Sequence, residues 1–575
     1  MKSKRFFSFS AFLMCVGLLL PFLAGAQTIQ NEAGYMSIEP INFYFHYGSY
    51  FNRLLLKSSE ARIWYSFHAA DSADLDTPLF IFFNGGPGSA TSSGLMSMYT
   101  TRYTLDNTIE SGGGNVYVNN PYSWTSMGHL LYIDAREAGF SYNLMDNVTD
   151  EGLRFLEFNA QNYNSFFDAA DYIRVLLRFL AAHPSLQDRP VIIVGESYGG
   201  TRTTAMLYLL HNYPDFGNDV EMYQDKALVD EIQSHFDTIF PGYAGQVVPS
   251  EVISQQFSHQ VLVQPTVSFR YQNLASDEMW HQTGSILYQI GNEVGIPYDP
   301  DEYPDAFYFV RDVCGRDIYM YTKPADWLNG FFNNGGVLLR QVQQLSTITG
   351  VDVTQISGLY AAARIQAYRV VNVDYVLSFQ PGPEDPFLRE LFKTPAILEA
   401  PIVRNEPGDL ETVFGVLKPW DRYFLGNNGF ALYAFHYWNV AQERGHDIYF
   451  YEPRYGRMFL KNVAHVATFI TNAALDLVVY TKAIPPSLAR HTDIVSSVQH
   501  VTTGTEARSG KIVINYQPSV FPDVTGLTER TIRFPQYASS CHAVSLTQPA
   551  EFLADVCKWL CENGINVKQG GGKKL

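Results

Sequence analysis

The sequence predicts an α/β protein with a mostly parallel central sheet that is flanked by helices. Three short apolar runs, at residues 78–83, 129–134 and 190–194, have the length and continuous hydrophobicity of buried strands. Between the last two, residues 159–182 carry apolar side chains at helical spacing. A strand, a helix and a further strand in series indicate parallel strands joined by a crossover helix.

The same alternation returns near the C-terminus. Residues 466–470, 511–515 and 530–534 are predicted strands, and residues 549–560 are a predicted helix. Between residues 209 and 439 the alternation is lost, and this stretch is rich in Tyr, Phe, Gln, Asn and Pro. We therefore expect a large, mainly helical insertion, or cap, between two halves of one core.

The expected division of the chain has five parts. They are a signal peptide (1–26), a first core segment (27–208), the insertion (209–439), a second core segment (440–568) and a disordered tail (569–575).

The composition is that of a large globular protein. Of the 575 residues, 46% are hydrophobic and 15% are aromatic, which is enough to build a sizeable core. The formal net charge of -17 argues against a nucleic-acid partner, because phosphates call for clustered Lys and Arg. The oligomeric state is left open by the sequence.

The pattern of residues at the N-terminus predicts that the protein is exported. Basic residues at 2, 4 and 5 precede an apolar stretch from Phe6 to about Leu23, and small residues at 24–26 form a cleavage site before Gln27. The alternative is an uncleaved membrane anchor, since the apolar stretch is nearly long enough to span a bilayer. The polar segment after the apolar stretch favours cleavage. We therefore expect a periplasmic or secreted protein that is not stably inserted in a membrane after cleavage.

The cysteines indicate neither a disulfide framework nor a metal centre. Only Cys314, Cys541, Cys557 and Cys561 follow the signal peptide. Cys557 and Cys561 are one helical turn apart, but no further Cys or His stands at zinc-ligand spacing. We expect packed thiols, no metal and no organic cofactor.

The pentapeptide Gly-Glu-Ser-Tyr-Gly at residues 195–199 indicates a nucleophilic serine. It follows the predicted strand 190–194 directly and precedes a stretch that can form a helix, which is the context that a G-x-S-x-G turn requires. The glycines allow a tight turn, and the N-terminus of the next helix favours developing negative charge. Ser197 is therefore the candidate nucleophile of an α/β-hydrolase fold.

A nucleophilic serine needs a base, and the base needs an orienting acid. In this fold the acid and then the histidine follow the serine along the chain. Fourteen histidines are present, so order alone selects little. Asp476 follows the predicted strand 466–470, and His542 follows the predicted strand 530–534. Strand ends are where sites in parallel sheets form, although either residue could be a surface group of its loop.

Six segments together resemble the successive signatures of the serine carboxypeptidase family, peptidase family S10. They occur in the family's order, at residues 84–88, 120–124, 139–142, 195–199, 475–479 and 541–549. The resemblance is to a divergent bacterial-type member. It implies an α/β-hydrolase core with a helical insertion, and a catalytic triad of Ser197, Asp476 and His542.

The resemblance also implies roles for four neighbours of the triad. Backbone N–H groups of Gly86 and Tyr198 would form the oxyanion hole, which stabilises the negative oxygen of the transition state. Asn84 and Glu196 would bind the free carboxylate of a peptide substrate. The family's second glutamate is replaced by Met98. Arg102, Arg136 and Arg202 are then candidate partners for a carboxylate, because they lie near the motifs.

The resemblance implies an enzyme that removes C-terminal residues from peptides through an acyl-enzyme. The loss of the second glutamate keeps a serine esterase or an acyltransferase open as an alternative. A catalytically silent protein that binds a ligand with its aromatic-rich insertion is the alternative from another class. Further departures from the family stand at Ser89, Ala473, Ala474, Cys541 and Ser545.

Overall fold

The computed structural model describes two large parts of the chain with gaps. The described ranges are 29–45, 54–72 without 59, 77–85, 91–106 without 93–94 and 97–99, 116–136, 141–144, 165–217, 223–267, 452–518 without 475, 477–478 and 503–506, and 527–567 without 541, with short pieces between 272 and 314.

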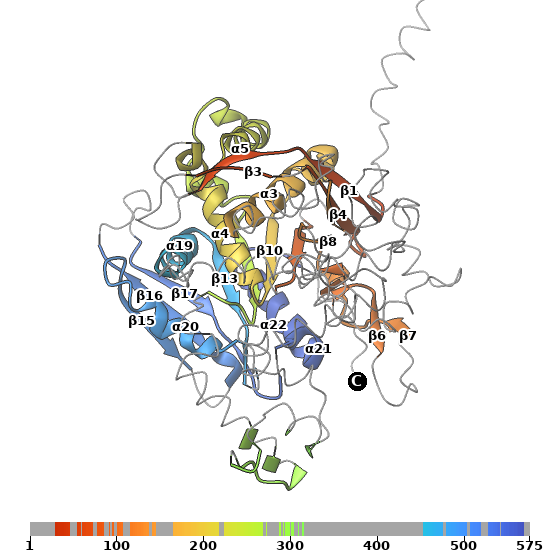
Figure 1. Ribbon diagram of the computed structural model, residues 1–575, viewed down its shortest axis with the longest axis vertical. Helices are drawn as coiled ribbons and strands as arrows, with labels where there is room; N and C mark the ends of the chain where they lie inside the picture. Colours follow the sequence, from red (N-terminus) through yellow and green to blue (C-terminus); the bar gives the residue numbers. More distant parts are fainter. Residues whose placement is uncertain are drawn as a thin grey trace, which may run out of the picture.

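A single large sheet runs through the molecule (Figure 1). Its strand order is β1-β4-β8-β5-β10-β12-β13-β17-β16-β15, and β9 pairs with β4 outside this path. The six strands from β8 to β17 are parallel, whereas the pairings at both ends are antiparallel. The strands are β1 (Glu32–Ile38), β4 (Glu60–His68), β5 (Leu79–Phe83), β8 (His129–Ile133), β9 (Tyr142–Leu144), β10 (Val191–Glu196), β12 (His259–Val263), β13 (Ala467–Ile470), β15 (Val495–Val501), β16 (Lys511–Tyr516) and β17 (Glu529–Arg533).

Helices cover both faces of this sheet, because successive residues of each buried strand point to opposite sides. Leu79, Ile81 and Phe83 of β5 belong to the core cluster under α3 (Ser165–Ala182) and α4 (Gly199–His211). Phe80 and Phe82 belong to the opposite cluster, with residues of α22 (Pro549–Glu562). The central strands are thus buried on both faces, which explains their unbroken hydrophobic runs.

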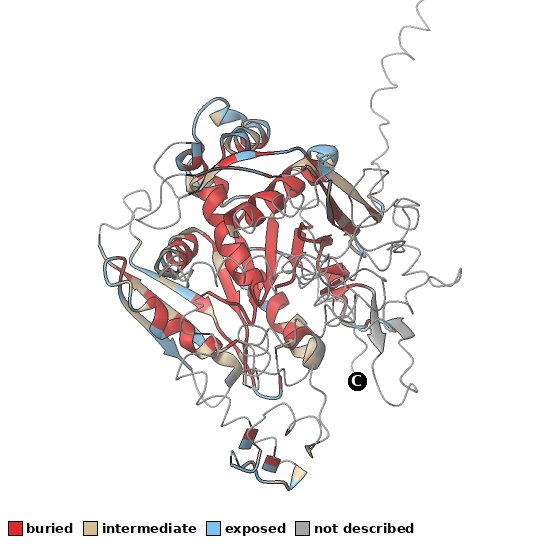
Figure 2. Ribbon diagram, viewed as in Figure 1, coloured by how far each residue is buried: buried red, intermediate tan, exposed pale blue. Residues whose placement is uncertain are grey.

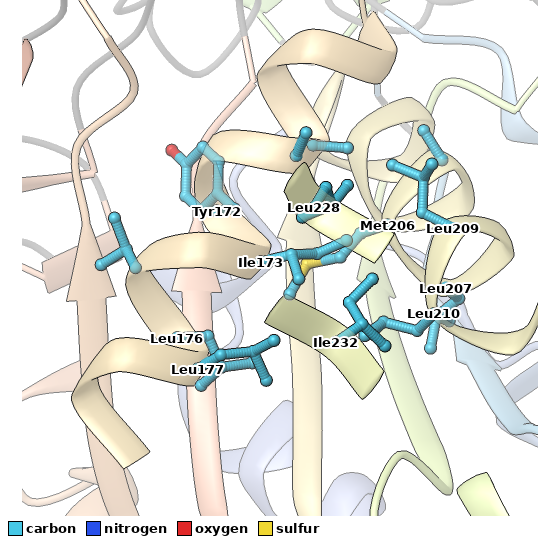
Figure 3. Packing of buried hydrophobic residues seen from close by; sticks show 14 of the residues in the cluster. Tyr172, Ile173, Leu176, Leu177, Met206, Leu207, Leu209, Leu210, Leu228 and Ile232 are labelled. Carbon is cyan, nitrogen blue, oxygen red and sulfur yellow. The ribbon is translucent and has the colours of Figure 1, made fainter. Parts of the chain in front are cut away.

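A layer of helices packs against one face of β10. Side chains of α3, α4 and α5 (Lys226–Ile239) pack together in it, among them Ile173, Met206 and Leu228 (Figure 3). Burial of each such side chain stabilises the fold by about 1.5–3 kcal/mol. Figure 2 shows α4, most of α3 and the strands β5, β8 and β10 as buried, while exposed residues concentrate on outer elements.

Smaller elements complete the described fold. They are the sheets β11-β2-β3, β14-β18 and β6-β7, and several short helices. Their bounds are β2 (Asn42–Phe45), β3 (Leu54–Lys57), β6 (Tyr103–Asp106), β7 (Val116–Asn119), β11 (Tyr223–Gln224), β14 (Asn472–Ala473), β18 (Gln536–Tyr537), α6 (Ser250–Ile253), α19 (Glu452–His465), α20 (Ile484–Leu488) and α21 (Val544–Thr547).

Six predicted strands and the C-terminal helix are confirmed within one or two residues, but five strands of the large sheet were not predicted: β1, β4, β9, β12 and β15. The most central of these is β12. β12 lies between β10 and β13 in the sheet. The core therefore continues to at least Val263, and the predicted boundary at residue 208 lies inside it. The strand was missed because only three apolar residues follow each other there. Its buried Gln260 donates through Nε2 to a distant partner, Thr468 Oγ1, at 2.8 Å.

Several expectations fall outside the described residues. These are the signal peptide at 1–26, the tail at 569–575 and most of the predicted insertion, including all of 315–451. Among the helices that the structure describes, none is both long enough and apolar enough to cross a bilayer.

The order and direction of the central strands are those of an α/β-hydrolase. A helix follows the central strand β10, and the loops after β13 and β17 reach the same edge of the sheet. The predicted fold class, a mostly parallel sheet flanked by helices, is confirmed.

Candidate active site

Ser197 occupies a strained turn between β10 and α4. Its φ of 60° lies in the left-handed region, which non-glycine residues rarely adopt. Its backbone N–H donates to the Val263 carbonyl at 3.0 Å, and its own carbonyl accepts from Gly200 N at 2.9 Å. Backbone strain that the surroundings hold in place is common at functional sites. The turn is therefore the tight elbow that the sequence predicts.

Glycine is required on both sides of this elbow by close packing. A Cβ on Gly85 would lie 2.5 Å from Tyr198 N and 2.6 Å from Ser197 Cβ. A Cβ on Gly195 would lie 2.5 Å from the Gly199 carbonyl oxygen. The loop after β5 can therefore approach Ser197 this closely only through a glycine backbone.

Asp476 and His542 meet at the ends of neighbouring strands. His542 Nδ1 lies 2.9 Å from Asp476 Oδ2, across 66 residues of sequence. The Asp476 side chain is 1% exposed and that of His542 is 18% exposed, so the carboxylate is buried and the imidazole is partly accessible to solvent. Because the carboxylate can only accept, Nδ1 carries the proton and Nε2 is left as the basic nitrogen.

The surroundings favour the protonated form of His542. Burial lowers the pKa of the imidazole, but the charge of Asp476, its hydrogen bond and the charge of Glu196 outweigh burial and raise the pKa above its usual value. An imidazolium formed during proton transfer is therefore stabilised in place.

Glu196 lies directly before Ser197 and is held by Asn84. Asn84 Nδ2 donates to Glu196 Oε1 at 2.9 Å, and Asn84 Oδ1 accepts from Leu95 N at 2.9 Å. Glu196 Oε2 is buried and has no hydrogen-bond partner among the described residues. Burial, with a smaller contribution from the charge of Asp476, raises the pKa of Glu196 to about 7 against the opposing effects of the His542 charge and the Asn84 hydrogen bond. The carboxyl group can therefore hold a proton in mildly acidic solution.

The three arginines proposed as carboxylate partners are bonded elsewhere. Arg102 Nε donates to Asp71 at 3.0 Å, and Arg136 Nε donates to Asp171 at 2.7 Å. Arg202 Nε donates to Asp168 at 2.6 Å, and its Nη1 donates to the Asn84 carbonyl at 2.5 Å. Their nearness in sequence was therefore misleading: Arg202 supports the backbone of Asn84 instead of facing a ligand.

Some of the predicted site lies outside the described residues. Gly86, one of the two predicted oxyanion donors, and Met98 are both in this group. Tyr198, the other donor, is the residue before the first residue of α4, where backbone N–H groups point out of the helix.

The sequence reasoning missed one residue of the site. Gln264 follows β12, and its Nε2 donates to Asp476 Oδ2 at 2.7 Å. Its position after a core strand was the available signal, but that strand had been assigned to the insertion.

The described cysteines and acidic groups are not arranged as a metal centre. Within the described parts of the chain, no three His, Cys, Asp or Glu side chains are grouped so as to hold an ion. Cys314, Cys557 and Cys561 are unoxidised thiols, and burial raises the pKa of Cys557 to about 11, with Cys561 adding to the effect.

The fold and these contacts define an α/β-hydrolase with a Ser elbow, an Asp–His pair and a buried Asn–Glu pair. The sequence model of the serine carboxypeptidase family matches residues 37–231. Serine carboxypeptidase-like 12 of Arabidopsis thaliana is 24% identical over 33% of this chain and 37% of its own length. A serine carboxypeptidase S10 family member 1 of Dictyostelium discoideum is 29% identical over 28% of this chain and 34% of its own length. Over these stretches the chain is similar to the serine carboxypeptidase family, peptidase family S10.

The chain spans about a third of the length of the first curated relatives that it matches. Among solved structures, it resembles the prohormone-processing carboxypeptidase Kex1(delta)p of Saccharomyces cerevisiae, with a TM-score of 0.41 and 12% identity over 92% of this chain and 91% of the other. It also resembles a proline iminopeptidase of Mycobacterium smegmatis, with a TM-score of 0.31 and 10% identity over 91% and 98% of the two chains.

Proposed function

We propose that this protein is an exported serine carboxypeptidase, which cleaves the last residue from peptides with a free C-terminus. Ser197 is the nucleophile, His542 the base and Asp476 the residue that orients it. The strained elbow at Ser197, the 2.9 Å Asp476–His542 contact and the family match over residues 37–231 support this proposal.

The chemistry follows from the arrangement of these groups. Ser197 Oγ attacks the last peptide carbonyl carbon while its proton passes to His542 Nε2. The oxygen that becomes negative accepts from the backbone N–H groups of Tyr198 and Gly86. His542 then gives the proton to the leaving amino group, the C–N bond breaks, and water hydrolyses the acyl-serine by the same route. Loss of one oxyanion donor typically costs roughly 100- to 1000-fold in rate.

The observation that favours a carboxypeptidase over other serine hydrolases is the Asn84–Glu196 pair beside the proposed nucleophile. A substrate carboxylate is repelled by an ionised Glu196 but can accept a hydrogen bond from a protonated one. With a pKa of about 7, Glu196 is mostly protonated at pH 5 and mostly ionised at pH 8. We therefore expect the free-acid substrates to be preferred, and more strongly so in acid.

Export and lineage are further parts of the proposal. The basic, apolar and small-residue segments of residues 1–26 support export and cleavage before Gln27, and a periplasmic or secreted location. Met98 and the other departures from the family signatures support a divergent member, and the form of the N-terminal segment supports a bacterial one. N-terminal sequencing of the protein recovered outside the cytoplasm tests the first point: an N-terminus at Met1 would contradict it.

The decisive experiment compares an N-blocked dipeptide with its C-terminal amide between pH 4 and pH 8. Wild type, Ser197→Ala and Glu196→Gln are measured side by side. We expect wild type to cleave only the free acid, Ser197→Ala to cleave neither, and Glu196→Gln to retain activity at pH 8 better than wild type. If wild type cleaves neither substrate while a fluorophosphonate labels Ser197, the peptidase assignment is wrong, and ester hydrolysis or acyl transfer takes its place.

A further inference from the structure

The segment that follows β12 touches both the nucleophile and the acid. Ser197 N donates to the Val263 carbonyl at 3.0 Å, and Thr266 N donates to the Ser197 carbonyl at 2.8 Å. Between these two contacts, the Gln264 side chain reaches Asp476. Four consecutive residues thus connect two site groups that are far apart in sequence.

Gln264 has a backbone conformation that its own residue type does not favour. Its φ is 45°, in the left-handed region, and it precedes Pro265, which restricts the conformation further. It is fully buried, and its N–H donates to Thr471 Oγ1 at 2.8 Å. A strained, buried, polar residue persists only where the surrounding contacts hold it, and such residues concentrate at functional sites.

The amide of Gln264 can be oriented in one way only. Its Oε1 accepts from Ala473 N at 2.7 Å and from Thr471 Oγ1 at 3.1 Å, while Nε2 donates to Asp476 Oδ2 at 2.7 Å. A flipped amide would place Oε1 against the carboxylate and the NH₂ group against the Ala473 N–H. Every polar atom of the side chain is therefore matched to its partner.

Asp476 Oδ2 accepts from two side chains at once, Gln264 Nε2 and His542 Nδ1. Its other oxygen accepts from Val479 N at 3.2 Å. A carboxylate with one oxygen shared in this way cannot rotate without losing a bond to Gln264. The direction in which the carboxylate faces His542 is therefore set jointly by Gln264 and the Val479 backbone.

We infer that Gln264 is a positioning residue for the proposed serine-hydrolase reaction, orienting the Asp476 carboxylate toward His542 and offsetting part of its charge. The inference rests on the proposed function. It assigns a role to the loop after β12, which binds the Ser197 turn through its backbone and Asp476 through its side chain.

The test uses Gln264→Met and Gln264→Glu in the full chain, with Gln260→Met as the matched control. Gln260 is a buried amide on β12, four residues before Gln264, and it bonds Thr468 instead of the site. The measurements are the rate of Ser197 labelling by a fluorophosphonate and hydrolysis of the blocked dipeptide, both as a function of pH. Thermal unfolding of each variant reports on folding separately.

We expect labelling and kcat to fall by about 10- to 100-fold in both Gln264 variants, the range for loss of a hydrogen bond to a charged group, with KM little changed. Without the Gln264 donor, the Asp476 charge acts more fully on His542, so the ascending limb of the pH profile moves to higher pH. Gln264→Glu adds a second negative charge beside Asp476, so the ascending limb should move to still higher pH. The activity of this variant should recover in part in acid, where the introduced carboxylate is protonated. Because Gln264→Glu keeps the shape of the side chain, it serves if Gln264→Met does not fold.

The inference is wrong if both Gln264 variants keep the pH midpoint and the kcat of wild type. It is also wrong if Gln260→Met changes the pH midpoint and kcat as much as the Gln264 variants do. A wild-type enzyme that is labelled at Ser197 but does not cleave peptides contradicts the proposed substrate and leaves the labelling test of Gln264 valid. A wild-type enzyme that is not labelled contradicts the proposed nucleophile, and with it the role of Gln264.

Discussion

Asn84 Nδ2 donates a hydrogen bond of 2.9 Å to Glu196 Oε1, across 112 residues of sequence. The bond joins the loop after β5 to the end of β10, and both residues are buried. Glu196 Oε2 is buried as well and has no partner among the described residues. A carboxyl group in this position is more stable with a proton than without one, and the consequences can be measured.

The stability of the protein should depend on the titration of Glu196. Its pKa is raised from 4.5 to about 7, so the folded state binds the proton more tightly than the unfolded chain. The contribution of this proton to the free energy of unfolding is therefore complete below about pH 4.5 and declines as the pH rises through about 7. We expect Glu196→Gln to equal wild type at pH 4 and to exceed it by up to about 3 kcal/mol at pH 8.

Urea unfolding of both proteins at pH 4, 6 and 8 checks this expectation. The matched control is Glu251→Gln, which changes an exposed carboxylate and should leave the pH dependence of wild type intact. A Glu196→Gln variant whose stability follows the wild-type pH dependence would show that Glu196 titrates normally in the folded protein.

Asp476→Asn should lower both the activity and the pKa of His542. Removal of the carboxylate removes the charge and the hydrogen bond that outweigh burial, so the ascending limb of the pH profile should move to lower pH. The wrong imidazole tautomer is then favoured, and loss of the charged acid typically costs roughly 10,000-fold in kcat. Fluorophosphonate labelling against pH measures both effects.

The control for this prediction is Asp493→Asn, because Asp493 forms an exposed ion pair with Arg457. It should leave the labelling rate and the pH midpoint unchanged. Wild-type labelling by Asp476→Asn would mean that another group orients His542.

Arg202→Met should destabilise the fold strongly. Arg202 pairs with Asp168 at 2.6 Å, and the two side chains are 0% and 2% exposed. Burial opposes the charge of the guanidinium, but the Asp168 carboxylate keeps its pKa above the usual value. Removal of one partner from a buried pair leaves an unpaired charge and costs about 3–5 kcal/mol.

Urea unfolding of Arg202→Met, Asp168→Asn and the double variant measures this cost. The free energy of unfolding should fall less in the double variant than the sum of the decreases in the two single variants. Lys226→Met, which breaks an exposed pair with Asp230, should cost under about 1 kcal/mol. The prediction is contradicted if breaking the buried pair and breaking the exposed pair lower the free energy of unfolding by similar amounts.

Gly85→Ala should damage the site. The new Cβ would lie 2.5 Å from Tyr198 N and 2.6 Å from the Glu196 carbonyl oxygen, so the loop or the elbow must shift. A shift that removes one oxyanion donor should lower the labelling rate by about 100-fold or more.

Gly242→Ala is the matched control, because nothing lies within 4 Å of its added Cβ. It should leave the labelling rate unchanged and stabilise the chain by up to about 1 kcal/mol. Wild-type labelling rates in Gly85→Ala would show that the loop after β5 can move away from the nucleophile at little cost.

The sequence predicted most of what depends on local pattern. Six apolar strands, the helix predicted at residues 159–182 and described as Ser165–Ala182, and the elbow at residues 195–199 can each be recognised from a few neighbouring residues. Periodicity and turn chemistry act over that distance. The pairing of Asp476 with His542 was also predicted, since both follow core strands and carry the family resemblance.

Contacts between distant segments were decided only by the tertiary structure. β12 was missed because its polar residues are buried against partners hundreds of positions away, such as Thr468 beside Gln260. The roles of Arg202, which bonds Asp168 and the Asn84 backbone, and of Gln264, which bonds Asp476, depend on the same kind of contact. By itself, the sequence determined the fold class and indicated the candidate site residues. Tertiary packing decided which polar groups face one another and with what charge, because hydrogen bonds and burial depend on distances that local pattern does not encode.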